Sequence, residues 1–485
     1  MRKVKLSIAI VISCVTLIAG SAGAQDITPA VMPDRLVDVA DAPGSPFPRF
    51  DNFSWRAFIA LNWPAMAGDP NRGRPDLAKK LADPGPRVWE TYKSRFEVFI
   101  PGAPRPAAWD SYDGANPCGP AVSNRTKTLS AFSHFADYNQ AAFTLSRLAN
   151  PLVDQKRIYT RYEVRINREE FDSIRDNEWF VRQKLPSDAN PGTFKDGSIE
   201  LKAAWRVLNA GDGVARHRYY MTKAMVLDAA ETLRTGAVVC SEQDVALVGL
   251  HIVIKTKLRP QWIWSSFEHV DNVRPKTDEP DAKSVPVTYS YDSGASAASI
   301  TQPPPPQISD TNPPVASPVP TQALRLQPIQ GSTMDMNRAY WALPEIKGTV
   351  WEHYMLVMTQ WPSNPGIPSP ASVGEPFPTG VSSTLANTTM ETYQQRNGKS
   401  CMECHQEVAN KFGRDFVAFM SFDASSPPLI AIATAAADAV VAARTAPALA
   451  RARHGASSVV KPAKPKRTPL DDDPVVKALA RMLSR

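Results

Sequence analysis

The pattern of apolar and polar positions predicts a helix near the start of the chain. Within Asn52–Trp63, apolar residues recur from Trp55 at steps of three and four, the spacing of one helix face. Residues 64–155 are rich in Pro and Gly and show little periodicity. We therefore expect one amphipathic helix followed by a long stretch of loops.

From residue 158 onward the period changes to two, which predicts strands. Apolar residues alternate with charged ones over 158–167 and 199–207, as in half-buried strands. Val245–Ile254 is almost entirely apolar and fits a strand buried on both faces. Further strands are expected at Trp262–Phe267 and Tyr354–Trp361, with a helix over Arg168–Leu185 and two more over Ala386–Asn397 and Lys399–Phe412.

Composition sets the expected domain boundaries. Pro275–Pro328 is so rich in proline that we expect a disordered insertion without a packed core. Strand patterning resumes after it, which places the insertion within one domain. The expected organisation is a signal peptide at 1–24, an N-terminal loop at 25–50, a mixed α/β main domain at 51–274, the insertion at 275–328, the rest of the main domain at 329–425, and an Ala-rich and basic tail at 426–485.

The first 24 residues are typical of a secretory signal. Basic residues precede the apolar run Leu6–Ile18, and Ala22-Gly23-Ala24 forms a small-residue cleavage site. An uncleaved membrane anchor is one alternative, but the run is shorter than the ~20 residues that a spanning helix needs. A lipoprotein signal ending at Cys14 is another, but the apolar run continues past Cys14. No later segment is a candidate membrane span, so we expect a periplasmic protein.

Residues Cys401-Met402-Glu403-Cys404-His405 form the pattern C-x-x-C-H. Two thiols at this spacing can each form a thioether with a haem vinyl group, and the histidine that follows can bind the iron. Half of a zinc site would need a second ligand pair, and a redox dithiol would favour a thioredoxin-like setting. The chain has no second C-x-x-C, and the motif follows a β-rich region. The motif therefore predicts one covalent haem c, held by Cys401, Cys404 and His405.

The sixth iron ligand is open at this stage. Met390 lies shortly before the motif, and His269 lies among polar residues after Trp262-Ile-Trp264. We expect one of these two, with Met420 as a third choice. His251 lies in an apolar strand and is interpreted as a core histidine.

The net charge and the cysteines further limit the functional class and the cellular compartment of the protein. The net charge of +7 is small for 485 residues and is concentrated partly at the two ends, and no nucleic-acid motif accompanies it. Cys118 and Cys240 are the only cysteines outside the signal and the C-x-x-C-H motif. We expect a disulfide between them in an oxidising compartment.

Several short segments of the sequence resemble a family of large bacterial proteins described simply as the cytochrome c family. The resemblance covers roughly residues 50–425, without the Pro-rich insertion. It implies haem binding and electron transfer in the periplasm, and it implies no substrate. The phrases that carry it are Ser54–Pro64, Val88–Tyr92, Gly197–Arg206, Arg218–Thr222, Gly249–Val253, Trp262–Trp264, Phe267–Asn272 and Ser400–His405.

Together these patterns predict an α+β fold. We expect a β-rich, antiparallel central region, flanking helices and a small helical segment near the C-terminus that carries the haem. The expected function is single-electron transfer to a redox partner protein, without nucleic acid and without a membrane span. The alternatives are a haem enzyme with an open or weakly ligated iron, such as a peroxidase or an oxidase subunit, and a binding module in which haem senses or only stabilises.

Overall fold

The computed structural model describes residues 38–41, 46–68, 70–129, 151–187, 189–209, 216–274, 289–294, 301, 315–366, 386–397, 401–402, 405, 415–417 and 420. The expected signal peptide at 1–24, the tail at 426–485 and Cys404 lie outside the described residues. So does most of the helix expected over Lys399–Phe412, although Cys401, Met402 and His405 are helical.

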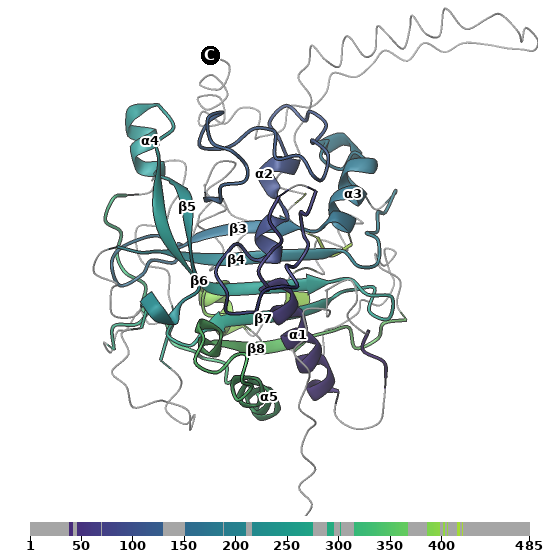
Figure 1. Ribbon diagram of the computed structural model, residues 1–485, viewed down its shortest axis with the longest axis vertical. Coiled ribbons are helices and arrows are strands. Elements are labelled where there is room, and N and C mark those ends of the chain that lie inside the picture. Colours follow the sequence, from purple (N-terminus) through teal and green to yellow (C-terminus); the bar gives the residue numbers. More distant parts are fainter. Residues whose placement is uncertain are drawn as a thin grey trace, which may run out of the picture.

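A curled, mixed sheet of eight strands forms the centre of the described fold (Figure 1). Its longest strand, β6 (Cys240–Ile254), pairs with β4 (Ile199–Val207) on one side. On its other side β6 pairs first with β5 (Met221–Leu227) and then with β7 (Ile263–His269), so two arms of the sheet share one strand. The remaining strands are β1 (Lys93–Ser94) and β3 (Arg161–Ile166) beyond β4, β2 (Thr128–Leu129) beyond β5, and β8 (Tyr354–Gln360) beyond β7.

The fold class is α+β, as the sequence predicts. Within the described residues the strand pairs are antiparallel, except that β2 pairs with β5 in parallel. The strands expected from the alternating patterns correspond to β3 and β4, and the apolar run Val245–Ile254 lies within β6. The period of two therefore identified the main strands of the sheet.

One face of the sheet is covered by α1 (Phe47–Leu61) and α5 (Gly331–Trp341). Helix α1 begins earlier than predicted, and its apolar stripe faces the sheet: Trp55 and Phe58 both contact Phe267 of β7. Ser54 on the same helix lies within hydrogen-bond distance of Ser265 in β7, at 2.7 Å between the two hydroxyl oxygens. Packed aromatic rings and a buried hydroxyl contact thus fix α1 across the strands.

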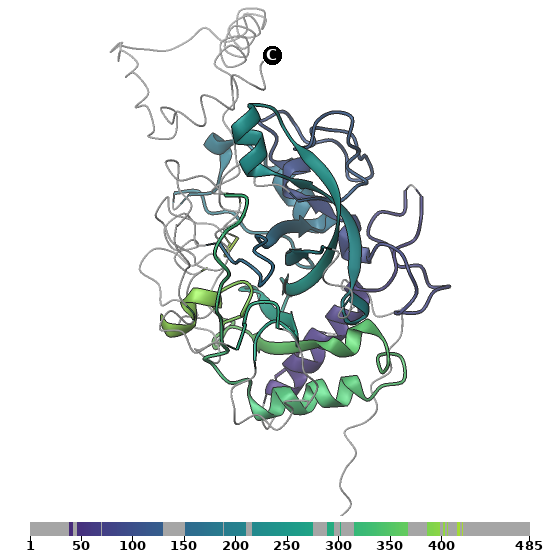
Figure 2. The same cartoon turned by 90° about the vertical axis from the view of Figure 1, so that its left-hand side faces the viewer.

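The other face of the sheet is covered by chain segments that come late in the sequence. A second apolar cluster there joins Tyr162 and Ala204 of the sheet to Tyr291, Met390 and Tyr393. Figure 2 shows the turn η8 (Thr392–Asn397), in yellow-green, on the opposite side of the strands from the purple N-terminal loops. The sheet is therefore a middle layer, with α1 and α5 on one face and Tyr291, Ala323 and residues 386–397 on the other, which we call the late-chain face.

The expectation that Pro275–Pro328 forms no packed core is wrong for its described parts. Tyr291 is fully buried, and its hydroxyl lies 2.8 Å from the hydroxyl of Thr160. Ala323 is also buried, and its backbone N–H donates to the Tyr291 carbonyl. Arg325 forms a buried ion pair with Glu268 of β7. Proline-rich composition did not reveal these anchors, because a few buried side chains are enough to order short stretches between proline turns.

Strand β3 also differs from its prediction as a half-buried strand, because every one of its residues is buried. Its polar face is covered by a second layer of charge: Glu163 accepts hydrogen bonds from Lys127 and from Arg165, each at 2.5–2.8 Å. Trp205 donates to the same carboxylate at 2.8 Å. Mutual pairing of these charges permits the burial that alternation alone does not predict.

The remaining elements are short and lie at the edges of the sheet. Helix α3 (Arg168–Asp176) follows β3 and is capped by the Asn167 side chain. Among the described helices none has the length and apolar content that a bilayer span requires. The other short elements of the described chain are α2 (Arg95–Val98), α4 (Ala229–Thr235), and the 3-10 turns η2 (Val88–Thr91), η4 (Arg182–Lys184), η6 (Arg216–Arg218) and η7 (Val350–His353).

The predicted disulfide between Cys118 and Cys240 is confirmed. It joins the loop before the edge strand β2 to the first residue of β6. It closes a loop with a sequence separation of 122 residues. A crosslink over such a distance stabilises the fold mainly by restricting the unfolded chain.

Replacing both cysteines by serine should lower the free energy of unfolding by up to about 4–5 kcal/mol, the loop-entropy limit for a ring of this size. Urea unfolding of the oxidised protein, of the double variant and of the reduced wild type measures the effect. The reduced wild type is the matched control and should resemble the variant. An unchanged urea midpoint in both would contradict the prediction.

Candidate functional site

The C-x-x-C-H segment lies at the end of strands β7 and β8. The backbone N–H of Met402 donates to the Gln360 side chain at 2.8 Å, and Gln360 pairs with Trp264 across the two strands. The Trp264 ring in turn lies 4.5 Å from the imidazole of His405, measured between ring centres. Cys401 packs at the boundary of two apolar clusters, beside Met358 and Met402. The sheet therefore contacts the motif both at Cys401 and Met402 and at His405.

The imidazole of His405 is oriented by a backbone carbonyl. Its Nδ1 lies 2.7 Å from the carbonyl oxygen of Phe416. Because a carbonyl can only accept, Nδ1 must carry the hydrogen, and the neutral ring then leaves its Nε2 unprotonated. Burial lowers the pKa of His405 to about 4, so the ring is neutral at physiological pH. A neutral imidazole with a bonded Nδ1–H is the arrangement of most histidines that bind metals through Nε2.

The carbonyl of Phe416 is itself held in place by the residue before it. Asp415 is completely buried, and its carboxylate lies 2.9 Å from the ammonium of Lys255, directly after β6. The same carboxylate accepts from the backbone N–H of Phe194 at 2.9 Å. The backbone oxygen of Asp415 accepts from the Trp262 indole at 3.1 Å. These bonds tie the segment 415–417 to three separate parts of the fold.

Three ionisable groups of the sheet and its covering segment act on His405. Lys202 and His251 lower the pKa of the imidazole, and Glu391 raises it, although burial remains the largest cause of its shift. Lys202 and His251 are opposite each other on β4 and β6. The imidazole therefore lies close to a polar row on the late-chain face of the sheet.

His269, one of the two residues predicted as the sixth ligand, does not fit that role. It is five residues from Trp264 on β7, so it lies roughly 17 Å along the strand and points to the opposite face. Its Nε2 is 3.1 Å from the carbonyl of Arg218, and its Nδ1 accepts from the backbone N–H of Asp271 at 3.1 Å. Both ring nitrogens are used. The polar residues beside His269 in the sequence suggested that it could reach the haem, but the strand points its side chain to the other face of the sheet.

The two methionines remain predictions as ligands. Met390 is fully buried in the second apolar cluster, among Tyr162, Ala204 and Val248. Met420 is also fully buried, in the first cluster, which also contains Met402 and Trp264. Both positions fit core side chains. Most of the tryptophans are buried core residues as well. Trp264 is also buried, and its ring contacts His405.

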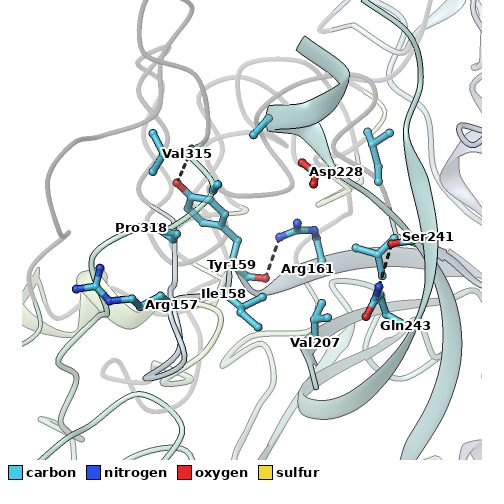
Figure 3. Close-up of a pocket in the computed structure, with 14 residues that line it drawn as sticks. Arg157, Ile158, Tyr159, Arg161, Val207, Asp228, Ser241, Gln243, Val315 and Pro318 are labelled. Atoms are coloured by element: carbon cyan, nitrogen blue, oxygen red, sulfur yellow. Dashed lines mark hydrogen bonds between the residues drawn. The ribbon is translucent and has the colours of Figure 1, made fainter. Parts of the chain in front are cut away.

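A cavity of about 220 Å³ lies elsewhere in the described fold (Figure 3). Arg161 of β3 and Tyr159 just before it line the cavity on one side, and Ser241 and Gln243 line it from β6. Its lining contains neither Cys401 nor His405. Arg161 bonds to the backbone oxygen of Tyr159 within it, so the cavity is a polar recess at the far end of the sheet and not part of the motif site.

No protein-family model matches this chain, and comparisons with curated proteins and with solved structures found no similar protein. Across the described residues, no three His, Cys, Asp or Glu side chains gather as a metal-ion site. The functional argument therefore rests on the motif and its surroundings.

Sequence reasoning missed the residues that position the motif. Asp415 and Phe416 lie ten and eleven residues after His405, and the contribution of Phe416 is a backbone oxygen that no residue type reveals. Trp264 belongs to the aromatic segment Trp262–Trp264, which stands out in the sequence. Its ring packs against the His405 imidazole.

An unpaired buried acid lies next to this anchor. Glu170 is the third residue of α3 and is completely buried, and neither oxygen of its side chain makes a hydrogen bond within the described structure. Burial raises its pKa well above the usual value, and the negative charges of Glu200 and Asp415 raise it further. The group is therefore held as the neutral acid at pH values where a surface glutamate is ionised.

Replacing Glu170 by glutamine should stabilise the protein at neutral pH. Because the pKa is raised on folding, the wild type binds this proton in the folded state, and stability falls as pH rises above 4.5, the unfolded value. Urea midpoints at pH 4 and pH 7.5 test this: the gain of Glu170→Gln should be larger at pH 7.5. The neighbouring Glu169→Gln is the control and should show no such pH-dependent gain.

Gly249 of β6 allows the late-chain segment to lie close to the sheet. A Cβ at this position would collide with the hydroxyl of Thr389 and would approach the Asn387 side chain. Asn387 also donates to the carbonyl of Phe267 at 2.9 Å, which fixes this segment over β7. The close approach therefore requires glycine.

Gly249→Ala should lower the free energy of unfolding by about 1–3 kcal/mol, the usual cost of overpacking. It should also speed proteolytic cleavage near residues 386–391. Gly331→Ala is the matched control, because an added Cβ there meets no atom within 4 Å. Equal unfolding midpoints for the two variants would contradict the close packing of Thr389 on β6.

Proposed function

We propose that this protein is an exported, periplasmic monohaem c-type cytochrome. Cys401 and Cys404 would attach one haem covalently, and His405 would bind its iron. The protein would pass single electrons to and from a redox partner protein. Export is supported by the basic and apolar start of the chain and by the Cys118–Cys240 disulfide, a bond typical of oxidising compartments.

The observation that carries the proposal is the bond between Nδ1 of His405 and the Phe416 carbonyl at 2.7 Å. In a protein that binds haem through the histidine of C-x-x-C-H, this bond fixes the ring orientation and leaves Nε2 for the iron. A histidine with only a structural role would be expected to bond through both nitrogens, as His269 does. The donor set and its orientation therefore fit haem c.

The surroundings of His405 fit an electron carrier. Trp264, Phe416 and Met420 belong to the apolar cluster that packs around the described part of the motif. Such side chains exclude water and keep the positions of the ligands unchanged between two oxidation states. The haem would supply reversible one-electron chemistry, and the protein would supply the apolar setting that tunes its potential.

The attachment is tested by expressing the mature chain with a cytochrome c maturation system. The wild type should keep its haem after denaturation and acid-acetone extraction, because thioether bonds survive both. Cys401→Ser and Cys404→Ser should each reduce or abolish covalent haem, as measured by haem staining of denaturing gels and by intact mass.

Cys118→Ser combined with Cys240→Ser provides the thiol control, since these residues lie outside the motif. This control should retain covalent haem although the protein is less stable. Free extraction of all haem from the wild type would refute the proposal. Rapid binding of carbon monoxide by the reduced wild type would instead favour a haem enzyme with an open iron.

A further inference from the structure

His251 lies on the face of the sheet that carries the motif. It is opposite Lys202 of β4 and opposite Ser266 of β7, so the three side chains form one row across the strands. Trp264 lies two residues from Ser266 and therefore points to the same face, at the diagonal position that in a sheet is about 7–8 Å away. Because His405 packs against Trp264, the two imidazoles face the same small region of the fold.

The side chain of His251 has a nitrogen that is available for a ligand. Nε2 is buried and makes no hydrogen bond in the described structure. Its neighbouring acid is Glu391, whose carboxylate oxygen lies 3.6 Å away, outside hydrogen-bond distance. The side chain as a whole is 13% exposed, so little water reaches it. A buried imidazole nitrogen left in this state is unusual and points to a partner that binds there.

Glu391 is held beside this imidazole by the backbone. Its carboxylate accepts from the backbone N–H of Asn387 at 3.0 Å. This bond holds the carboxylate beside the His251 ring, where a negative charge would favour added positive charge on or beyond the imidazole.

His269 and His217, two other histidines of the described chain, lack this combination. His269 uses both nitrogens and faces the opposite side of the sheet. His217 is exposed in the turn η6. His251 thus combines a buried nitrogen that makes no hydrogen bond among the described residues with a position diagonal to Trp264, the ring that packs against His405.

We propose that His251 is the second protein ligand of the haem iron, together with His405, and that Glu391 supports it as a negatively charged neighbour. This inference rests on the proposed haem attachment and names its ligand set. Two imidazoles would give a lower reduction potential than a histidine and a thioether, and the adjacent carboxylate would lower it further by favouring the oxidised iron. The apolar strand around His251 suggested a core histidine, and its unbonded nitrogen argues against that interpretation.

The experiment uses the full mature protein with haem attached. The oxidised wild type should be low-spin in electron paramagnetic resonance, and its optical spectrum should lack the thioether-to-iron band at its red edge. The reduced wild type should bind carbon monoxide slowly. His251→Ala should become high-spin and bind carbon monoxide rapidly, and added imidazole should restore the low-spin signal.

Two further variants keep the test informative if His251→Ala folds poorly. His251→Met should remain low-spin, gain the thioether band and have a higher reduction potential. Glu391→Gln should remain low-spin and should also have a higher potential than the wild type. His217→Ala is the matched control, and its spectra and potential should equal those of the wild type.

The result that overturns the inference is covalent haem with unchanged spectra in His251→Ala and His251→Met. Met390 or Met420 would then be tested as the ligand. A wild type that carries covalent haem but is high-spin would also overturn it, while leaving the haem attachment intact. Only a wild type without covalent haem would overturn the proposed function together with this inference.

Discussion

The position of His405 depends on one buried ion pair, between the Asp415 carboxylate and the Lys255 ammonium at 2.9 Å. Lys255 comes directly after β6, so the pair connects the motif segment to the longest strand of the sheet. Removing one partner would leave the other charge buried and unpaired, which costs about 3–5 kcal/mol in proteins. The Phe416 carbonyl orients His405 only because this anchor holds the backbone beside it.

Polar groups perform a similar task across the late-chain face of the sheet. Glu268 of β7 pairs with Arg325 and accepts from the backbone N–H of Thr388 at 2.8 Å. Asn387 bonds to the carbonyl of Phe267 beside it. Apolar contact alone would allow the covering segment to slide along the strands. Directional bonds to buried groups select one register, because any other register leaves a buried charge or donor unsatisfied.

The sequence predicted the features that depend on local periodicity or on a compact motif. The alternation in 199–207 identified β4, and the spacing from Trp55 identified α1. Helix α5 was missed because its sequence, Gly331–Trp341, is polar over most of its length and has only a weak apolar stripe. The disulfide followed from counting cysteines, which needs no geometry.

The candidate site was predictable only in part, for a physical reason. A strand pattern says which residues share a face, but it does not say which segment will cover that face. His269 and His251 lie on neighbouring strands. Sequence context suggested that His269 could reach the haem and that His251 was a core residue, yet His269 points to the face covered by α1 and His251 points to the face that carries the motif. The groups that surround such a residue come from far along the chain, as Glu391 does beside His251.

The two faces of the sheet are covered by different parts of the chain, and this has a consequence for quality control. A polypeptide that lacked the residues from 386 onward would still hold every strand of the sheet, yet it would lose the cover that Met390 and Tyr393 give to the apolar face around Tyr162, Ala204 and Val248. A broad apolar surface of this kind attracts chaperones and proteases. Cys401 and His405 come after these residues in the sequence, so a chain cut short before 386 would lack both the cover of this face and the motif.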